Sequence, residues 1–350
     1  MTLADLMAQT LTTDTGLEAT VPCQISTVRE ATTKTGKPYY EVEIADATAS
    51  EKFKVWQDSP AFAQCRELQG GDCVAASGRF YRNSYGLNVD ELDLAALDPG
   101  AKEELFAGPP ERREQLEREE AWVRACVEGL DDPRLRRLGL AFLEQHGERF
   151  RRAAAARDYH HARRGGLLEH TAQMLRTANA LATAYPDVNW DLVKTGVLFH
   201  DSGKLWENGY EEFGFVSPLL QIGEMLGHIP IGIELVNQLW RQLDAEGDPA
   251  FAAEGVPTKE QVRLHLLHLI ASHHGLREYG SPVTPRSPEA WMLHYIDNID
   301  AKHEILRGAY AENPEVAAGI FERKRPLEGR PVRPLPKWKP QENELPLEEG

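Results

Sequence analysis

Between residues 18 and 97, apolar and polar side chains alternate with a period of two. Tyr40, Val42 and Ile44, for example, alternate with two glutamates. This pattern is typical of half-buried strands. Five strands are predicted, near residues 20–29, 40–44, 52–56, 74–81 and 87–94, separated by turn-forming runs at 34–38, 69–72 and 83–86. Five short strands in about 80 residues favour an OB-type barrel, with a small sandwich or an SH3-like barrel as alternatives.

From about residue 121 to 322 the apolar positions follow a helical period. Six side chains fall on one helical face: Leu167, Leu168, Thr171, Met174, Leu175 and Ala178. Ser287, followed by Pro and Glu, is typical of a helix start. We therefore predict a multidomain α and β chain, in which an all-α domain at 121–322 follows the barrel domain at 18–97.

Three further segments are predicted to lie outside these two domains. Residues 1–17 form an N-terminal extension, and the charge-rich stretch 98–120 is a linker with Pro109 and Pro110 in its middle. Residues 323–350 combine proline with charge. Because such a composition cannot bury a core, we expect this tail to be extended or disordered.

Composition indicates a soluble globular protein, since 41% of the residues are hydrophobic and 27% are charged. No apolar run approaches the about 20 residues that span a bilayer, and residues 1–16 do not resemble a signal peptide. We therefore expect a cytoplasmic protein whose four cysteines are reduced. The net charge of -16 argues against a general nucleic-acid coat protein.

One segment is basic although the chain as a whole is acidic. Residues 149–164 contain six arginines and a single acid, Asp158. Such a run is often a solvated helix face. Because it leads directly into a candidate metal ligand, we interpret it as a phosphate-binding segment.

The strongest chemical signal is an ordered set of histidines and aspartates, each beside a glycine or at the polar end of a helical stretch. The set comprises His170, His200, Asp201, His228, His273, His274 and Asp297. A single histidine in an apolar helix is usually a core residue, and we interpret His265, His268 and His294 in that way. An apolar domain would not bury so many ionisable groups without a metal or hydrogen-bond partners.

These ligand types predict a divalent metal site. Imidazole and carboxylate ligands without thiolate suit Mn, Fe, Co, Ni or Zn. One ion is assigned to His170, His200, Asp201 and Asp297, and the remaining histidines would complete a second ion with Asp201 as a bridge. Two such ions hold the attacking and leaving oxygens of an in-line displacement, which is the chemistry of phosphoester hydrolysis. Lys204, one helical turn after Asp201, could neutralise a phosphate oxygen, although it could also be an ordinary surface lysine.

The predicted outward face of the strands carries aromatic side chains interleaved with cations: Tyr39, Lys52, Lys54, Trp56, Arg79 and Tyr81. Such a face suits stacked bases beside neutralised phosphates, as in single-stranded nucleic-acid binding. The alternative is that these aromatics pack on the neighbouring domain.

Several motifs together resemble those of the bacterial YhaM-like exoribonucleases, over roughly residues 18 to 310. They are HHAxxGGLLEHT from His160, HDxGK from His200, GHI from Gly227, SHHG from Ser272, GSP from Gly280 and YIDNxDAK from Tyr295. The resemblance implies an OB domain followed by an HD domain of the phosphohydrolase superfamily. It also implies removal of mononucleotides from the 3′ end of single-stranded RNA, and to some extent DNA, using a divalent metal with manganese favoured. The other metals considered are Fe, Co, Ni, Zn and Mg.

The resemblance also suggests residue roles. It implies His170, His200, Asp201 and Asp297 as core ligands, with His228, His273 and His274 at a second ion. Asp201 and Lys204 would be catalytic. On the substrate side we expect His160, His161, Arg163 and Arg164. Ser202 departs from the family pattern, in which a branched apolar residue is usual.

Two other functions remain open. One is an HD-type nucleotide phosphohydrolase or cyclic-nucleotide phosphodiesterase, because fold alone does not settle function. The barrel domain argues against it, since a hydrolase of small molecules has little use for such a domain. The other is a non-catalytic nucleic-acid-binding protein with a structural metal, which the ligand set and Lys204 disfavour.

Overall fold

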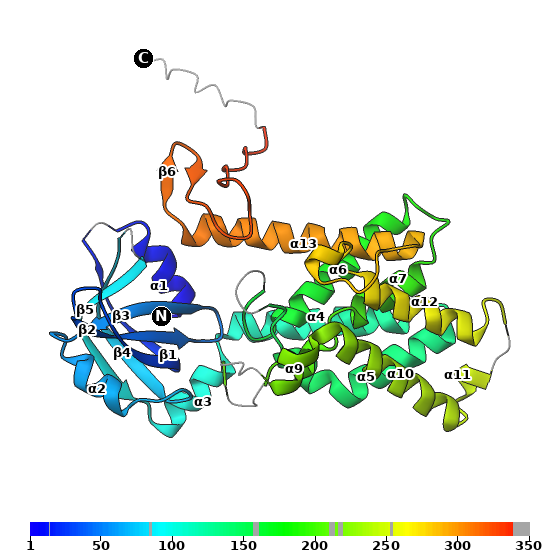
Figure 1. Cartoon of the computed structure of the whole chain (residues 1–350), viewed down its shortest axis with the longest axis horizontal. Helices are drawn as coiled ribbons and strands as arrows, with labels where there is room; N and C mark the ends of the chain where they lie inside the picture. Colours follow the sequence, from blue (N-terminus) through cyan, green and yellow to red (C-terminus); the bar gives the residue numbers. More distant parts are fainter. Residues whose placement is uncertain are drawn as a thin grey trace, which may run out of the picture.

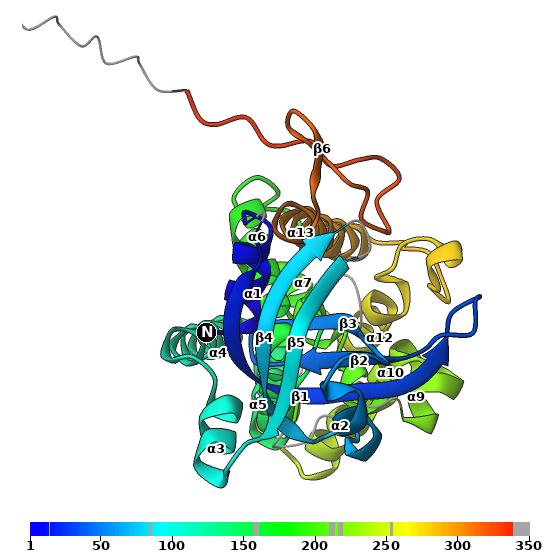
Figure 2. The same ribbon diagram turned by 90° about the vertical axis from the view of Figure 1, so that its left-hand side faces the viewer.

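The N-terminal part of the chain is a five-stranded antiparallel sheet (Figure 1). The computed structural model describes residues 1–13, 15–83, 86–156, 161–209, 214–215, 220–252 and 255–338. The strand order is β3-β2-β1-β4-β5, and the strands are β1 (Leu17–Thr32), β2 (Pro38–Ala45), β3 (Ser50–Trp56), β4 (Cys73–Asn83) and β5 (Gly86–Ala96). Each predicted strand lies within one of these. Figure 2 shows β4 and β5 running across the direction of β2 and β3, and the edge strands β3 and β5 contact each other.

The alternation in the sequence becomes alternating burial in the sheet. In β3, Phe53 and Val55 are buried while their neighbours Lys52, Lys54 and Trp56 are exposed. Two short helices, α1 (Leu3–Thr10) and α2 (Ala61–Glu67), pack against the strands.

The segment predicted as an N-terminal extension contributes to the core of the sheet. Leu3 and Leu6 of α1 have no exposed surface and belong to the same apolar cluster as the strands. Thr2 and Asp5 form a capping box at the start of this helix. The amide of Leu3 also donates to the carboxylate of Asp46 at 2.7 Å. These contacts fix α1 on the sheet.

The segment 98–120 was expected to be a linker, and its conformation is helical. Its helices are α3 (Pro99–Ala107) and α4 (Pro110–Glu128). The Asp98 side chain caps α3 by accepting from the amide of Ala101 at 2.9 Å. Pro99 and Pro110 occupy first-turn positions, where a missing N–H costs nothing. The prolines therefore start these helices instead of preventing them.

The C-terminal part is helical, as the period predicted. Its helices are α5 (Pro133–Arg152), α6 (Gly166–Ala182), α7 (Trp190–Phe199), α8 (Lys204–Glu207), α9 (Gln221–Leu226), α10 (His228–Ala245), α11 (Pro249–Ala252), α12 (Lys259–Ser272), a 3-10 turn (Arg277–Tyr279) and α13 (Pro288–Glu312). Helix α7 is central and packs against α5, α6, α12 and α13. The long α13 runs along the helical part and reaches α1 beside the sheet (Figure 1). Among the described residues, no helix combines the length and apolarity needed to cross a membrane.

After α13 come a short hairpin of β6 (Glu315–Ala317) and β7 (Ile320–Phe321) and the start of the proline-rich tail. Part of this tail is attached to the fold. The Tyr310 hydroxyl donates to the carbonyl of Val332 at 2.9 Å, and Val332 forms a bridge with Ile320. The remainder of the predicted tail, residues 339–350, lies outside the described residues.

Candidate metal centre

The predicted ligands come from the ends of different helices. His200 directly follows α7, His228 is the first residue of α10, and His273 directly follows α12. Close backbone packing brings two of these ends together. A Cβ on Gly203 would lie 1.9 Å from the carbonyl oxygen of His228, so only glycine allows this approach.

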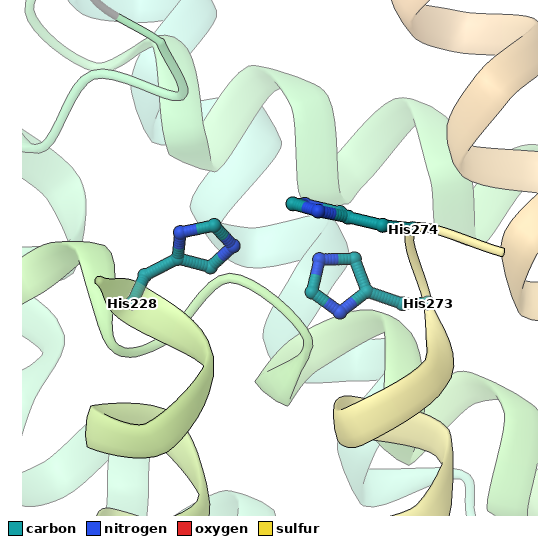
Figure 3. A group of neighbouring side chains, drawn as sticks. All are labelled: His228, His273 and His274. Carbon is teal, nitrogen blue, oxygen red and sulfur yellow. The ribbon is translucent and has the colours of Figure 1, made fainter. Parts of the chain in front are cut away.

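The histidine rings are held through one nitrogen, Nδ1. This atom lies 2.8 Å from the Val197 carbonyl in His200, 2.8 Å from the Ile270 carbonyl in His273 and 2.7 Å from the Tyr279 carbonyl in His274. Donation from Nδ1 fixes the tautomer and leaves the Nε2 lone pair available, as is usual for metal-binding histidines. Figure 3 shows His228 from α10 facing His273 and His274 from the end of α12.

Asp201 lies between two groups of ring nitrogens. Its Oδ2 is 3.3 Å from Nε2 of His200, and its Oδ1 is 3.4 Å from Nε2 of His228 and 3.7 Å from Nε2 of His273. On the His200 side, Nε2 of His170 is 3.3 Å from Oδ1 of Asp297. Ligand atoms bound to one ion at about 2.1 Å are about 3.0–3.4 Å apart. The two oxygens of Asp201 therefore face two candidate ligand sets.

The donor set fits a divalent metal. The Nε2 atoms of His200, His228 and His273 and Oδ1 of Asp201 are buried without a hydrogen-bond partner among the described residues. Leaving several buried polar atoms unsatisfied is costly, and divalent cations held by the two ligand sets would satisfy all four. Within the described residues, three groups have metal-binding spacing: His228, His273 and His274; His170, His200 and Asp201; and His161, His170 and Asp300.

Charges in the site favour the ligating forms of most groups. Burial opposes ionisation of Asp201, yet Lys204 and His200 hold its pKa well below 3.8. Burial, reinforced by His274, lowers the pKa of His273 well below 6.5 and keeps this ring neutral. For His170, burial is outweighed by hydrogen bonds to two carboxylates, which raise its pKa to about 9. Ligation through His170 therefore requires loss of a proton.

Lys204 points into the site, as the spacing after Asp201 predicted, and only 13% of its side chain is exposed. Its Nζ lies 2.7 Å from Oδ2 of Asp201 and also donates to the Ala155 carbonyl. Burial disfavours the cation, but Asp201 outweighs burial and raises the pKa of Lys204. The ammonium group is therefore charged and fixed beside the candidate ligands.

Asp300 is a supporting residue that the sequence analysis did not select. Its Oδ2 lies 2.7 Å from Nδ1 of His170 and 3.0 Å from Nε2 of His161. His161 was predicted on the substrate side, but it is buried behind His170 and 6% exposed. Its predicted neighbour His160 lies outside the described residues. A signal for Asp300 was present in the sequence, because it follows Asp297 at helical spacing.

Other supporting carboxylates also escaped the sequence analysis. Glu207 lies 3.7 Å from Nδ1 of His228. Glu169, beside His170, binds Arg112 and Arg163. Arg163, predicted to meet substrate, is thereby engaged inside the protein, and it also pairs with Glu304 at 2.9 Å. Arg164 donates to the Gly214 carbonyl at 2.7 Å.

On the sheet, three of the predicted substrate residues form one cluster. The rings of Tyr39 and Trp56 are 5.2 Å apart, and Lys54 lies over both. Acidic side chains of the neighbouring strand β2 lie opposite the lysines of β3. Glu41 is paired in register with Lys54, and Glu43 with Lys52. These glutamates reduce the positive potential of the strand face below what the pattern of aromatic and cationic residues predicts.

Arg79 and Tyr81 occupy a different strand, β4. The Arg79 guanidinium lies 2.8 Å from Asp90, and the Tyr81 hydroxyl donates to the same carboxylate at 3.3 Å. Asp90 therefore offsets the charge of Arg79.

Known proteins are similar to this chain over most of its length. The HD domain family model matches residues 167–302. A "3'-5' exoribonuclease YhaM" from a Geobacillus strain is 30% identical over 296 residues, covering 84% of this chain and 85% of the relative. Another from Oceanobacillus iheyensis is 30% identical over 280 residues, covering 79% of this chain and 81% of the relative. No solved structure matches. The chain therefore belongs to the YhaM family, and its HD domain makes it a metal-dependent hydrolase.

Proposed function

We propose that this protein is a 3′-to-5′ exonuclease that hydrolyses single-stranded RNA, and to some extent single-stranded DNA, to mononucleotides. The observation that carries the proposal is the position of Asp201 between two sets of ring nitrogens, with Lys204 on the same carboxylate. Such a site suits phosphoryl chemistry, and the relatives described above are named as exoribonucleases.

We propose that His170, His200, Asp201 and Asp297 hold one divalent ion. His228, His273 and His274 would hold a second ion with Asp201, and manganese is the favoured metal. When bound, such ions activate water and stabilise the leaving oxygen of a phosphodiester. Lys204 has a separate role, because its fixed ammonium can donate to a non-bridging phosphate oxygen as negative charge develops there.

The sheet domain, proposed as an OB-type barrel over 18–97, would hold the strand while the helical domain at 121–322 hydrolyses its end. Contact between β3 and β5 supports closure of the sheet, and the Tyr39–Trp56 pair offers rings on which bases can stack. A hydrolase of small nucleotides would gain nothing from these features. A purely structural metal would not require the buried Lys204.

The proposal is tested with purified protein, Mn²⁺ and end-labelled single-stranded RNA, beside nucleoside triphosphates and cyclic nucleotides. Mononucleotides should accumulate from RNA, and the Asp201→Asn variant should lose at least about 100-fold in rate because the central carboxylate is gone. Asp187→Asn, which removes an exposed acid, is the control. Consumption of free nucleotides alone would establish the phosphohydrolase alternative, and inactivity toward all substrates would favour the binding protein.

A further inference from the structure

A cavity of about 270 Å³ lies where the sheet meets the helical part. Ala47, from the turn between β2 and β3, forms one part of its wall, and Phe106 of α3 forms another. The remaining wall includes five arginines from α4, α5 and the segment before α6: Arg112, Arg113, Arg151, Arg152 and Arg164. We call this the arginine cavity.

The charge of the arginine cavity is unusual for this chain. Its lining has five arginines and one acid, Glu148, in a protein with a net charge of -16. Two neighbouring cavities at the same junction are balanced. One is lined by three acids and three cations, and the other by four acids and four lysine or arginine side chains. Positive charge is therefore concentrated in one cavity and not spread along the junction.

The arginines of this cavity differ in how closely a carboxylate is paired with each of them. Arg112 is bound by Glu169, and Arg151 by Glu120 at 3.0 Å. Arg152 has a weaker partner, because Glu148 is 3.7 Å away and 87% exposed. The Nε of Arg152 is buried and has no hydrogen-bond partner within the described ranges. Arg113 presents an exposed side chain. Arg113 and Arg152 are thus the arginines best placed to accept an anionic ligand.

The lining also has an apolar part, formed by Phe106, Leu116 and two alanines. The Phe106 ring already packs on the Phe215 ring, with centroids 5.5 Å apart, so recognition would come from the guanidinium groups, which form charge-assisted hydrogen bonds with phosphate. The lining therefore fits a phosphate group, with apolar surface beside the arginines.

We propose that the arginine cavity binds phosphate groups of the substrate strand as the strand passes from the sheet to the metal centre. This inference rests on the proposed function, because it assumes a polymer held by one part of the molecule and hydrolysed in the other. It assigns the strand a path through the one basic cavity among the three described at the junction.

The test measures binding of a fluorescent 12-nucleotide single-stranded RNA to the full chain in EDTA, where no metal-dependent turnover occurs. Arg113→Gln combined with Arg152→Gln should raise Kd about tenfold and lower the slope of log Kd against log salt by about 0.7 per lost phosphate contact. Arg118→Gln combined with Arg241→Gln removes the same number of charges from exposed positions on α4 and α10 and should leave both quantities unchanged. Equal behaviour of the cavity variant and this control would overturn the proposal.

Two further arms separate the ligand source and the underlying function. If the cavity variant loses affinity for AMP but binds RNA like the parent, the cavity serves free nucleotides and the strand path is wrong. With Mn²⁺, hydrolysis of bis(p-nitrophenyl) phosphate should be the same in parent and variant, which shows that the metal centre is intact. Because the binding assay requires no turnover, failure of the parent to degrade RNA would contradict the proposed function and leave the test of the arginine cavity unaffected.

Discussion

The buried pair of Lys204 and Asp201 joins a cation to the carboxylate at the middle of the site. The Lys204→Ala variant should lower kcat more than it raises KM, because the ammonium meets charge that grows in the transition state. A loss of about 100-fold in kcat is expected for one such electrostatic contact. Steady-state kinetics on single-stranded RNA measure kcat and KM separately. A change confined to KM would show that Lys204 only binds substrate.

Asp300 holds His170 from behind, so its removal should act through the metal. Supporting carboxylates of this kind typically contribute about 10–100-fold in metal affinity. Asp300→Asn should therefore weaken Mn²⁺ binding in calorimetry by that order, and excess Mn²⁺ should restore most of the activity. Glu304→Gln, one turn further along α13, removes a charge without touching His170 and is the control. Unchanged Mn²⁺ affinity in Asp300→Asn would remove this supporting role.

The sequence singled out the candidate ligands but not the residues that support them. His200 and His273 stand out because each belongs to a polar pair that ends an apolar helix. Asp300 forms a hydrogen bond with His161, which lies 139 positions away in the sequence. No local sequence pattern indicates that contact. The partners of Arg163 could not be predicted for the same reason. The sequence of an arginine-rich segment does not show whether its side chains face solvent or internal carboxylates.

At the scale of elements, Asp132 begins α5 and stabilises it in two ways. Its carboxylate accepts from the Arg134 amide at 2.9 Å and pairs with the buried Arg134 guanidinium at 2.7 Å. Burial opposes ionisation, but Arg134 outweighs it and lowers the pKa of Asp132 below 3.8. Asp132→Ala should lower the free energy of unfolding by about 1–3 kcal/mol.

The sign of the pH dependence follows from the lowered pKa. The Asp132 carboxylate contributes fully to the free energy of unfolding above about pH 4, near its pKa in the unfolded chain. This contribution is lost as the pH falls through the pKa of Asp132 in the folded state. The difference in unfolding free energy between parent and Asp132→Ala should therefore be constant from pH 5 to 8 and shrink in stronger acid. Denaturant melts of the exposed neighbour Asp131→Ala provide the control. A difference that grows in acid would contradict the charged pair.

Strands were easier to predict than the connecting helices. The period of two placed all five strands because each has one buried face, as in Phe53 and Val55. In contrast, α3 buries only Leu105, and α4 is rich in charge, so neither shows a strong apolar stripe. The prolines there suggested a linker, whereas they occupy helix starts.

At the scale of the whole molecule, the sheet should matter for long strands and not for small substrates. Trp56→Ala should raise the KM for single-stranded RNA by an amount equivalent to about 1–3 kcal/mol, the contribution of one stacked base. Hydrolysis of bis(p-nitrophenyl) phosphate should be unaffected, because this ester needs only the metal centre. Tyr185→Ala, an exposed aromatic in the helical part, is the matched control. Equal loss on both substrates would indicate misfolding instead of lost stacking.

The most direct test of the central claim is the polarity of degradation. Single-stranded RNA is supplied with Mn²⁺ either with its 3′ end blocked or with its 5′ end blocked, and the products are resolved by length. We expect the 3′ block to protect the strand, whereas 5′-blocked RNA should shorten stepwise to mononucleotides. Equal decay of both substrates, or decay of the 3′-blocked strand alone, would contradict a 3′-to-5′ exonuclease.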